Sequence, residues 1–226
     1  MKTFAAEYEL LRQEVDAAAA RCSRDKNDIS ILPVSKTFPI EAIREAYDYG
    51  IRAFGENKVQ ELALKHEALP DDIEWHFIGH LQSNKAAKAV ELAHWIHSVD
   101  SIKLLNKLNR HAGELQRRPR ILIEVNSGEE AKSGVSYDML EELVQAALQV
   151  ENLELKGLMT MAPLTDDASA WQQAFAKLKN TRDALEKKFS IALPVLSMGM
   201  TGDFEYAIAE GSTLLRIGTR LFGRRG

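Results

Sequence analysis

Eight short apolar segments alternate with helical segments along this chain, and this alternation constrains the fold more than any other feature. The segments are rich in Ile, Leu, Val and aromatic residues, and their near-continuous apolar character predicts strands that are buried on both faces. Such strands, separated by helices, are typical of a parallel sheet with covered faces. The predicted strands are ISILPVSK (29–36), IRAFGEN (51–57), EWHFIGH (74–80), WIHSVDS (95–101), RILIEVN (120–126), LELKGLMTM (153–161), PVLSMGM (194–200) and STLLRIGT (212–219).

Segments whose apolar residues recur at helical spacing follow the predicted strands. After the first strand, apolar residues recur at helical spacing from residue 40, with Pro39 at the expected first helical position and Gly50 at the end. Asp100 or Ser101 can cap the helix that follows the fourth strand. Residues 3–22, which are rich in Ala, Glu and Leu, predict one more helix before the first strand.

The count of eight strand–helix units favours an α/β fold of the (β/α)8 TIM-like barrel type. A doubly wound open sheet is the competing interpretation, because periodicity alone does not separate the two. The chain has 226 residues, and a barrel of this type takes about 250. The strands occupy the chain from about residue 29 onward, so we expect a single domain over residues 1–226, with an N-terminal helical segment (1–28) packed on the barrel.

Composition and charge exclude several classes of protein. The net charge is −4 and the isoelectric point is about 5.9, which argues against general affinity for nucleic acid because that binding is mainly electrostatic. Cys22 is the single cysteine, so no internal disulfide can form, and this suits a reducing compartment. The N-terminal segment lacks the apolar core of a signal peptide, and no apolar run approaches the ~18 residues of a membrane span. We therefore expect a soluble cytoplasmic protein.

The predicted strands end repeatedly in Gly, Ser, Thr, Asn or a charged residue. In a parallel barrel such ends gather at one mouth, where chemistry takes place. The segments after strands seven and eight, SMGMTG (197–202) and RIGT (216–219), supply hydroxyls and backbone N–H groups with little steric cover. They predict a phosphate site, with simple glycine turns as an equally weighted alternative.

Two basic residues in these strands are candidates for a site. Lys36 ends the first apolar strand, so its amine can face the mouth as a nucleophile that forms a Schiff base; a snorkelling surface lysine is the alternative. Arg216 lies between Leu215 and Ile217 in a buried strand and needs a partner. It can hold a ligand, or it can form a structural ion pair, for which Glu124 is a candidate.

Other chemical signals are weak. No cluster of His, Cys and Asp has the spacing of a metal site, so we expect no metal. No nucleophile elbow, Walker sequence or dinucleotide-binding fingerprint is present. The methionines at 159, 161, 198 and 200 could line an apolar pocket, but the interpretation as core residues is favoured.

Eight blocks of sequence, in order from residue 32 to residue 223, resemble one family. They are LPVSKTFP (32–39), FGENKVQE (54–61), WHFIGHLQSNK (75–85), IHSVDS (96–101), VNSGEEAKSGV (125–135), GLMTMAP (157–163), LSMGMTGDFEYAI (196–208) and GSTLLRIGTRLFG (211–223). Together they resemble the pyridoxal 5′-phosphate homeostasis proteins, small proteins that bind pyridoxal 5′-phosphate (PLP) and are related to the N-terminal barrel domain of alanine racemase.

This resemblance implies a barrel that holds PLP as a Schiff base on Lys36. It also implies that the loops after strands seven and eight bind the phosphate, and that Arg216 faces the pyridine nitrogen. The positions that match the family's cofactor site are Lys36, Asn57, His80, Ser197, Met200, Thr201, Arg216, Gly218 and Thr219. No catalytic residue is expected.

The sequence departs from the family's usual pattern at two places. Lys58 stands where the family often has Tyr or Arg, which matters little for the cofactor. The segment VNSGEEAKSGV is one residue shorter than the usual form, so the shape of the loop after strand five and any role for Lys132 stay open.

The resemblance implies a protein of PLP and vitamin B6 homeostasis that buffers PLP, or delivers it to PLP-dependent apoenzymes, without catalytic turnover. We expect a monomer. A PLP-dependent amino-acid racemase is the first alternative, but it needs a second base from a second domain, for which the chain has no residues to spare. A regulatory interaction protein that senses PLP is the other alternative.

Overall fold

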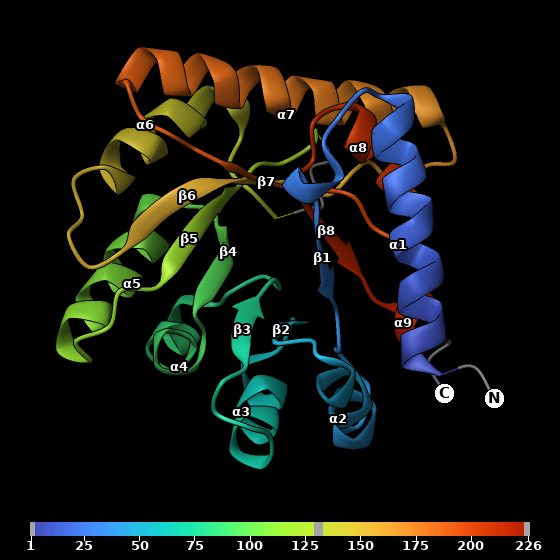
Figure 1. The fold of residues 1–226 in the computed structure, drawn as a ribbon. Helices are drawn as coiled ribbons and strands as arrows, with labels where there is room; N and C mark the ends of the chain where they lie inside the picture. The colour runs from blue at the N-terminus through green and yellow to red at the C-terminus, as the bar shows by residue number, and fades with distance from the viewer. Residues whose placement is uncertain (1–2, 129–132, 224–226) are drawn as a thin grey trace.

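The computed structural model describes residues 3–128 and 133–223 and contains eight parallel strands in a nearly closed barrel surrounded by helices (Figure 1). Every predicted strand is confirmed, although each is shorter than its apolar segment. The strands are β1 (Ser30–Pro33), β2 (Ala53–Glu56), β3 (Glu74–Phe77), β4 (Trp95–Val99), β5 (Arg120–Glu124), β6 (Glu154–Met159), β7 (Val195–Ser197) and β8 (Leu214–Ile217).

The order of the strands confirms the barrel over the open sheet. Neighbouring strands pair in parallel in the order β1-β8-β7-β6-β5-β4-β3-β2, so the first strand pairs with the last. The remaining gap, between β1 and β2, is bridged by the single pair Val34–Gly55, and the backbone N–H of Ser35 donates to the carbonyl of Gly55 at 3.0 Å. The carboxyl ends of all eight strands therefore meet at one mouth.

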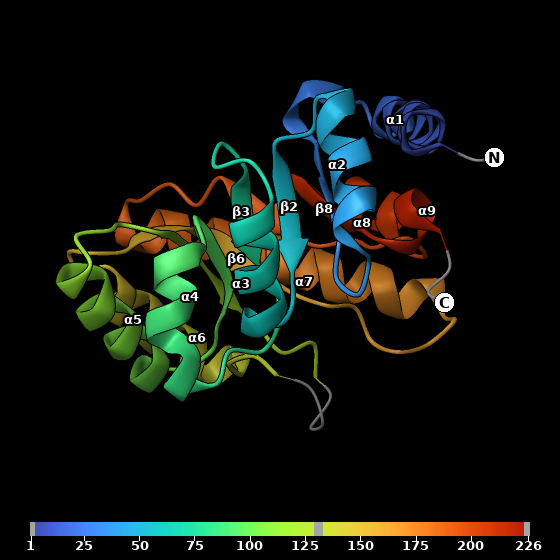
Figure 2. The ribbon, with the colours of Figure 1, turned by 90° about the horizontal axis from the view of Figure 1, so that it is seen from below.

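Helices cover the outside of the barrel, as Figure 2 shows from a second direction. Ser101 caps its helix as predicted, because its Oγ accepts a hydrogen bond from the N–H of Leu104 at 3.4 Å. Gly50 ends its helix in the left-handed region, with φ of 115°. Pro39, predicted at the first helical position, lies one residue earlier, at the N-cap. The helices are α1 (Phe4–Arg21), η1 (Lys26–Asp28), α2 (Ile40–Tyr49), α3 (Val59–Ala68), η2 (Ser83–Lys85), α4 (Ala86–Leu92), α5 (Ile102–Glu114), α6 (Tyr137–Ala147), α7 (Ala168–Phe189), α8 (Phe204–Ala209) and α9 (Thr219–Phe222).

The predicted N-terminal helix is present as α1, and it packs against α2, α8 and α9 (Figure 1). Arginines fix this end of the chain to the barrel. The Arg12 guanidinium donates to the carbonyl of Ile29 at 2.9 Å, and that of Arg24 donates to the carbonyls of Ile208 and Ser212 at 2.8 and 2.7 Å. Phe4, Leu11 and Val15 bury the apolar face of the helix.

One apolar core connects the strands with the helices around them. Its largest fully buried side chains include Trp75, Phe54, Phe77 and Phe175. Within the described residues, no helix is both long and apolar enough to cross a membrane. Lys132, for which the sequence leaves a role open, lies outside the described residues.

Candidate functional site

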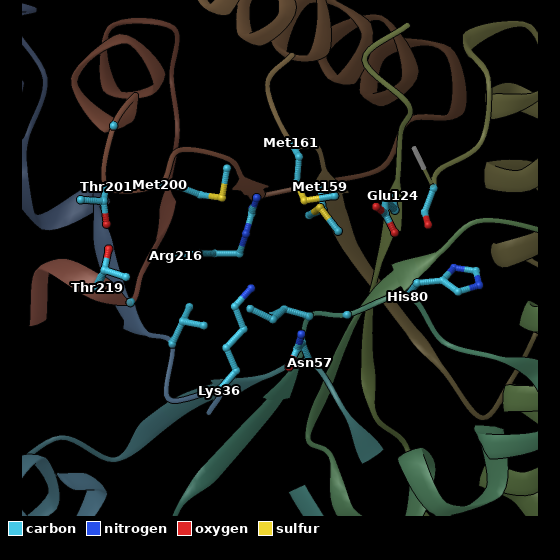
Figure 3. Close-up of a pocket in the computed structure, with 16 residues that line it drawn as sticks. Lys36, Asn57, His80, Glu124, Met159, Met161, Met200, Thr201, Arg216 and Thr219 are labelled. Carbon is cyan, nitrogen blue, oxygen red and sulfur yellow. The ribbon is translucent and has the colours of Figure 1, made fainter. Parts of the chain in front are cut away.

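A pocket of about 410 Å³ opens at the mouth where the strands end (Figure 3). Residues from the ends of strands or the loops after them line it, as the barrel prediction requires. Eight of the lining residues are sequence-predicted site residues: Lys36, Asn57, His80, Met200, Thr201, Arg216, Gly218 and Thr219. The other lining residues are Val34, Ile78, Gly79, Glu124, Ser133, Met159, Met161 and Gly202.

Lys36 extends into this pocket, and its amine points toward the guanidinium of Arg216 (Figure 3). The residues on either side hold its backbone in place. The Ser35 hydroxyl donates to Glu56 Oε1 at 2.6 Å, and the Thr37 N–H donates to Glu61 Oε1 at 2.5 Å. Thr37 has a positive φ of 69°, so the chain turns sharply directly after the lysine.

A buried ammonium group joins the two hydrogen bonds that Ser35 and Thr37 make with Glu56 and Glu61. The Nζ of Lys65, on α3, donates to the carbonyl of Ser35, to Glu56 Oε1 and to Glu61 Oε1, each at 2.7 Å. Burial raises the pKa of the Glu56 carboxyl, while hydrogen bonds from Lys65 and Ser35 oppose that shift. We call Ser35, Glu56, Glu61 and Lys65 the anchor cluster. It holds the segment that carries Lys36 from both sides.

Arg216 lies on the floor of the pocket and is satisfied by neutral oxygens. Its Nη1 donates to the carbonyl and the hydroxyl of Ser197 at 2.6 and 2.8 Å, and its Nη2 donates to the carbonyl of Thr160 at 2.9 Å. Burial lowers the pKa of Arg216 to about 10, and Asp203 and Glu124 act against that shift through space. The guanidinium therefore makes its hydrogen bonds with Ser197 and Thr160, and not with Glu124, the ion-pair partner that the sequence suggested.

Two pocket residues have a buried oxygen that finds no hydrogen-bond partner among the described residues, Asn57 Oδ1 and Glu124 Oε2. Glu124, at the end of β5, is 3% exposed. Burial, with a smaller effect of Asp100, raises its pKa to about 7, and Arg216 opposes the shift. Because unpaired buried polar atoms are costly, both oxygens indicate a site built to contact a ligand.

Thr201 and Thr219 lie on the side of the pocket formed by the loops after β7 and β8. Figure 3 shows their hydroxyl groups turned toward one another. Gly199 turns the first loop with φ of 96°, and a Cβ there would lie 2.7 Å from that of Ala207. The N–H of Met200 donates to Asp203 Oδ1 at 2.5 Å, which fixes the loop. The two loops thus present hydroxyls and small residues together, as predicted.

Ser197 and His80 differ from the other predicted residues. The Ser197 side chain is fully buried beneath Arg216 and does not line the pocket. His80 does line the pocket, but its side chain is 56% exposed, and its Nδ1 lies 3.6 Å from Asp100 Oδ2. In Figure 3 its ring points away from Lys36.

Sequence reasoning missed two features of the site. Glu124 was considered only as a partner of Arg216, and two methionines favoured as core residues, at 159 and 161, line the pocket. Met200 lines it too, as the family resemblance implied. A carboxylate ending an apolar strand was the available signal for Glu124. Nothing in the local sequence distinguished the methionines.

Comparison with known proteins matches the alanine racemase N-terminal domain family over residues 9–226. The pyridoxal phosphate homeostasis protein of Aquifex aeolicus is 44% identical over 215 residues, which is 94% of each chain. PipY of Synechococcus elongatus PCC7942, solved with PLP bound, is 40% identical with a TM-score of 0.82, over 92% of this chain and 99% of PipY. An alanine racemase from Clostridium difficile shares the fold at 14% identity and a TM-score of 0.72; the match covers 94% of this chain and 56% of the racemase.

Proposed function

The chain belongs to the family of pyridoxal phosphate homeostasis proteins, and from this premise we propose that its pocket binds PLP and that the protein serves PLP homeostasis. In this proposal Lys36 holds PLP as a Schiff base. The protein buffers PLP or delivers it to PLP-dependent apoenzymes, without catalytic turnover and as a monomer. The observation that carries the proposal is the amine of Lys36 facing Arg216 inside a pocket rimmed by hydroxyls.

The residues present fit PLP. Lys36 supplies an amine for the aldehyde, and forming the C=N bond releases one water. Thr201, Gly218 and Thr219 would hold the phosphate with hydroxyls and backbone N–H groups, and Met200 lies beside them. The amide of Asn57, with its unpartnered Oδ1, would contact the ring side of the ligand.

Arg216 determines what chemistry the bound group can supply. A guanidinium that faces the pyridine nitrogen disfavours a proton on that nitrogen, because two positive charges would lie side by side. An unprotonated ring withdraws electrons weakly and stabilises a carbanion poorly. Arg216 therefore supports holding PLP rather than turning over an amino acid.

The racemase alternative calls for a tyrosine as its second base, and no tyrosine lines the pocket among the described residues. Tyr137 begins α6, and its ring lies 3.8 Å from Lys177 Nζ. Tyr206 packs against Trp171 at 5.6 Å between ring centroids. Neither tyrosine lines the pocket. A racemisation assay over several amino acids tests this point, and turnover well above that of free PLP would favour the enzyme.

The visible absorption spectrum of the purified protein with PLP tests the proposal. We expect an imine band in the wild type and in Lys58→Ala, which removes a neighbouring exposed lysine, and no imine band in Lys36→Ala. Borohydride reduction followed by mass mapping should locate the modification at Lys36. A wild-type protein without the band under PLP saturation, or modification at another lysine, would contradict the proposal.

A protein that senses PLP and regulates partners is the remaining alternative. Pulldown with and without PLP separates it from a carrier, since a sensor should change partners between the two states. An unchanged set of partners would favour buffering and delivery.

A further inference from the structure

A line of polar side chains, all buried except Glu74 at its far end, crosses the barrel interior from the pocket to the opposite mouth. From Arg216 Nη1 to the Ser197 hydroxyl the distance is 2.8 Å, and from that hydroxyl to His97 Nδ1 it is 3.1 Å. From His97 Nε2 to His76 Nδ1 it is 3.0 Å, and from His76 Nε2 to Glu74 Oε1 it is 3.2 Å. We call Ser197, His97, His76 and Glu74 the polar relay.

The relay occupies space that barrels of this type fill with branched apolar residues. Ser197 and His97 are fully buried, and His76 is 4% exposed. Polar groups in such a position are costly unless each is hydrogen-bonded, and here every member has a partner on both sides. His76 and His97 are 21 residues apart in the sequence, and His97 and Ser197 are 100 apart. The contacts therefore join different strands of the barrel and do not arise from a local turn or helix.

Donor and acceptor accounting from the Glu74 end gives the position of each proton when both rings are neutral. The ionised Glu74 carboxylate can only accept, so His76 donates to it from Nε2 and accepts at Nδ1 from His97 Nε2. His97 Nδ1 is then an acceptor and takes the proton of the Ser197 hydroxyl. The Ser197 oxygen in turn accepts from Arg216, which can only donate. All four hydrogen bonds therefore run in one direction.

This direction stabilises a positive charge at the pocket end. Each acceptor lone pair faces Arg216, and the relay ends on a carboxylate that Trp95 Nε1 and Arg120 Nη1 also hold, at 2.8 and 3.0 Å. Burial lowers the pKa of His76 and lowers that of His97 well below its usual range, so both rings are neutral near pH 7. Glu74 and Arg120 face His76, and His76 and Arg216 face His97.

We propose that Ser197, His97, His76 and Glu74 are positioning residues, which hold the charged guanidinium of Arg216 in the orientation that meets the pyridine ring of the ligand. The inference rests on the proposed binding of PLP, and it extends the site to the opposite mouth of the barrel. Ser197, expected to contact phosphate, acts instead through Arg216.

Nitrogen NMR of the unliganded protein tests the relay without PLP. We expect His76 and His97 both to be neutral and protonated on Nε2 at pH 7. An imidazolium at either position, or a proton on His97 Nδ1, would overturn the proposed direction. A result against the relay here leaves PLP binding itself untouched.

Matched serine variants test the consequence for the ligand. Ser197→Ala removes the relay's contact with Arg216, whereas Ser98→Ala removes a fully buried β4 hydroxyl with no hydrogen-bond partner. Because a hydrogen bond to a charged group is involved, we expect about tenfold weaker PLP binding and a shifted absorption band in Ser197→Ala. We expect no change in either readout in Ser98→Ala.

Glu74→Gln tests whether the far end of the relay matters. Its unfolding midpoint is measured first, so that binding is compared only under conditions where the protein is folded. We expect PLP binding at least about threefold weaker, with the band shifted in the same direction as in Ser197→Ala. Unchanged affinity and spectrum in folded Ser197→Ala and Glu74→Gln would overturn the proposal. Absence of PLP binding in the wild type would instead refute the proposed function.

Discussion

Replacing Lys65 with methionine removes the buried ammonium group at the centre of the anchor cluster. In the wild type its Nζ donates three hydrogen bonds of 2.7 Å, to Ser35, Glu56 and Glu61. Methionine fills similar space but donates nothing, so the Glu56 carboxyl is left in the core with only the Ser35 hydroxyl. The substitution therefore tests whether this cluster stabilises the segment that carries Lys36.

The structure indicates the size of the effect. Removing one partner of a buried ion pair costs about 3–5 kcal/mol. The side chains of Lys65 and Glu56 are 5% and 0% exposed, so the pair belongs to this class. Glu61 is 21% exposed and regains water. Glu56 can also take up a proton. We therefore expect a loss of about 3 kcal/mol in the free energy of unfolding.

The loss should depend on pH. Burial raises the pKa of Glu56, and removal of Lys65 raises it further, because the ammonium group opposes that shift. A carboxyl whose folded pKa lies above its unfolded value of about 4.3 costs stability progressively as the pH rises from that value through the folded pKa. Both proteins lose stability together just above pH 4.3, so the deficit of Lys65→Met relative to the wild type should grow once the pH exceeds the folded pKa of Glu56 in the wild type.

Urea denaturation at about pH 5 and about pH 8 measures both quantities. Lys88→Met is the control, because Lys88 pairs with Glu91 at the surface, where such pairs contribute about 0–1 kcal/mol. The double variant Lys65→Met/Glu56→Gln should recover part of the loss at the higher pH. A loss below about 1 kcal/mol at both values, or a deficit that shrinks as the pH rises, would refute the reasoning.

Three further predictions concern the pocket and the relay. Burial raises the pKa of Glu124 to about 7, so this carboxyl costs the wild type stability as the pH rises from about 4.3 to 7. The free energy of unfolding of Glu124→Gln, measured with urea, should therefore rise relative to that of the wild type by up to about 3 kcal/mol across this range. A difference between the two proteins that does not change with pH would contradict this. The depressed pKa values of His76 and His97 mean that these two rings bind more protons in the unfolded chain below about pH 6.5, so their contribution to stability should fall with acidification below that value. Because Glu124 acts in the opposite sense over the same range, this contribution is measured as the difference in unfolding free energy between the wild type and His97→Gln. A difference that stays constant between pH 6.5 and 5 would exclude a buried neutral His97 ring. Gly79→Ala would place a Cβ 2.2 Å from the Asn57 carbonyl oxygen, so we expect about 3 kcal/mol of destabilisation and a lowered melting temperature. An unchanged melting temperature would show that the backbone at Gly79 moves away from Asn57 without cost.

The fold could be predicted because its determinants are local. Apolar runs such as Arg120–Glu124 mark strands, and capping residues such as Ser101 and Gly50 mark where helices begin and end. The carboxyl ends of parallel strands meet at one mouth, so the predicted site residues on different strands gather there with no knowledge of distances.

The site could be predicted only in part, because strands buried on both faces carry no alternation that says which way a side chain points. Ser197 was therefore expected beside the ligand, and it lies beneath Arg216. Lys65 stands among helix formers, and nothing local distinguishes it from the exposed Lys88. The contact of His97 with Ser197 spans 100 residues, a separation that no local pattern encodes.

The single backbone bridge between β1 and β2 has a consequence for where the barrel can change its circumference. Elsewhere most neighbouring strands are joined by several paired residues, but here Val34 and Gly55 meet alone, and the Ser35 and Glu56 side chains tie the same two strands together. Widening the ring at this seam breaks fewer backbone hydrogen bonds than widening it between most other pairs of strands. Lys36 follows directly after the seam, so a ligand attached there would be bound where the anchor cluster, rather than a run of paired backbone residues, closes the cylinder.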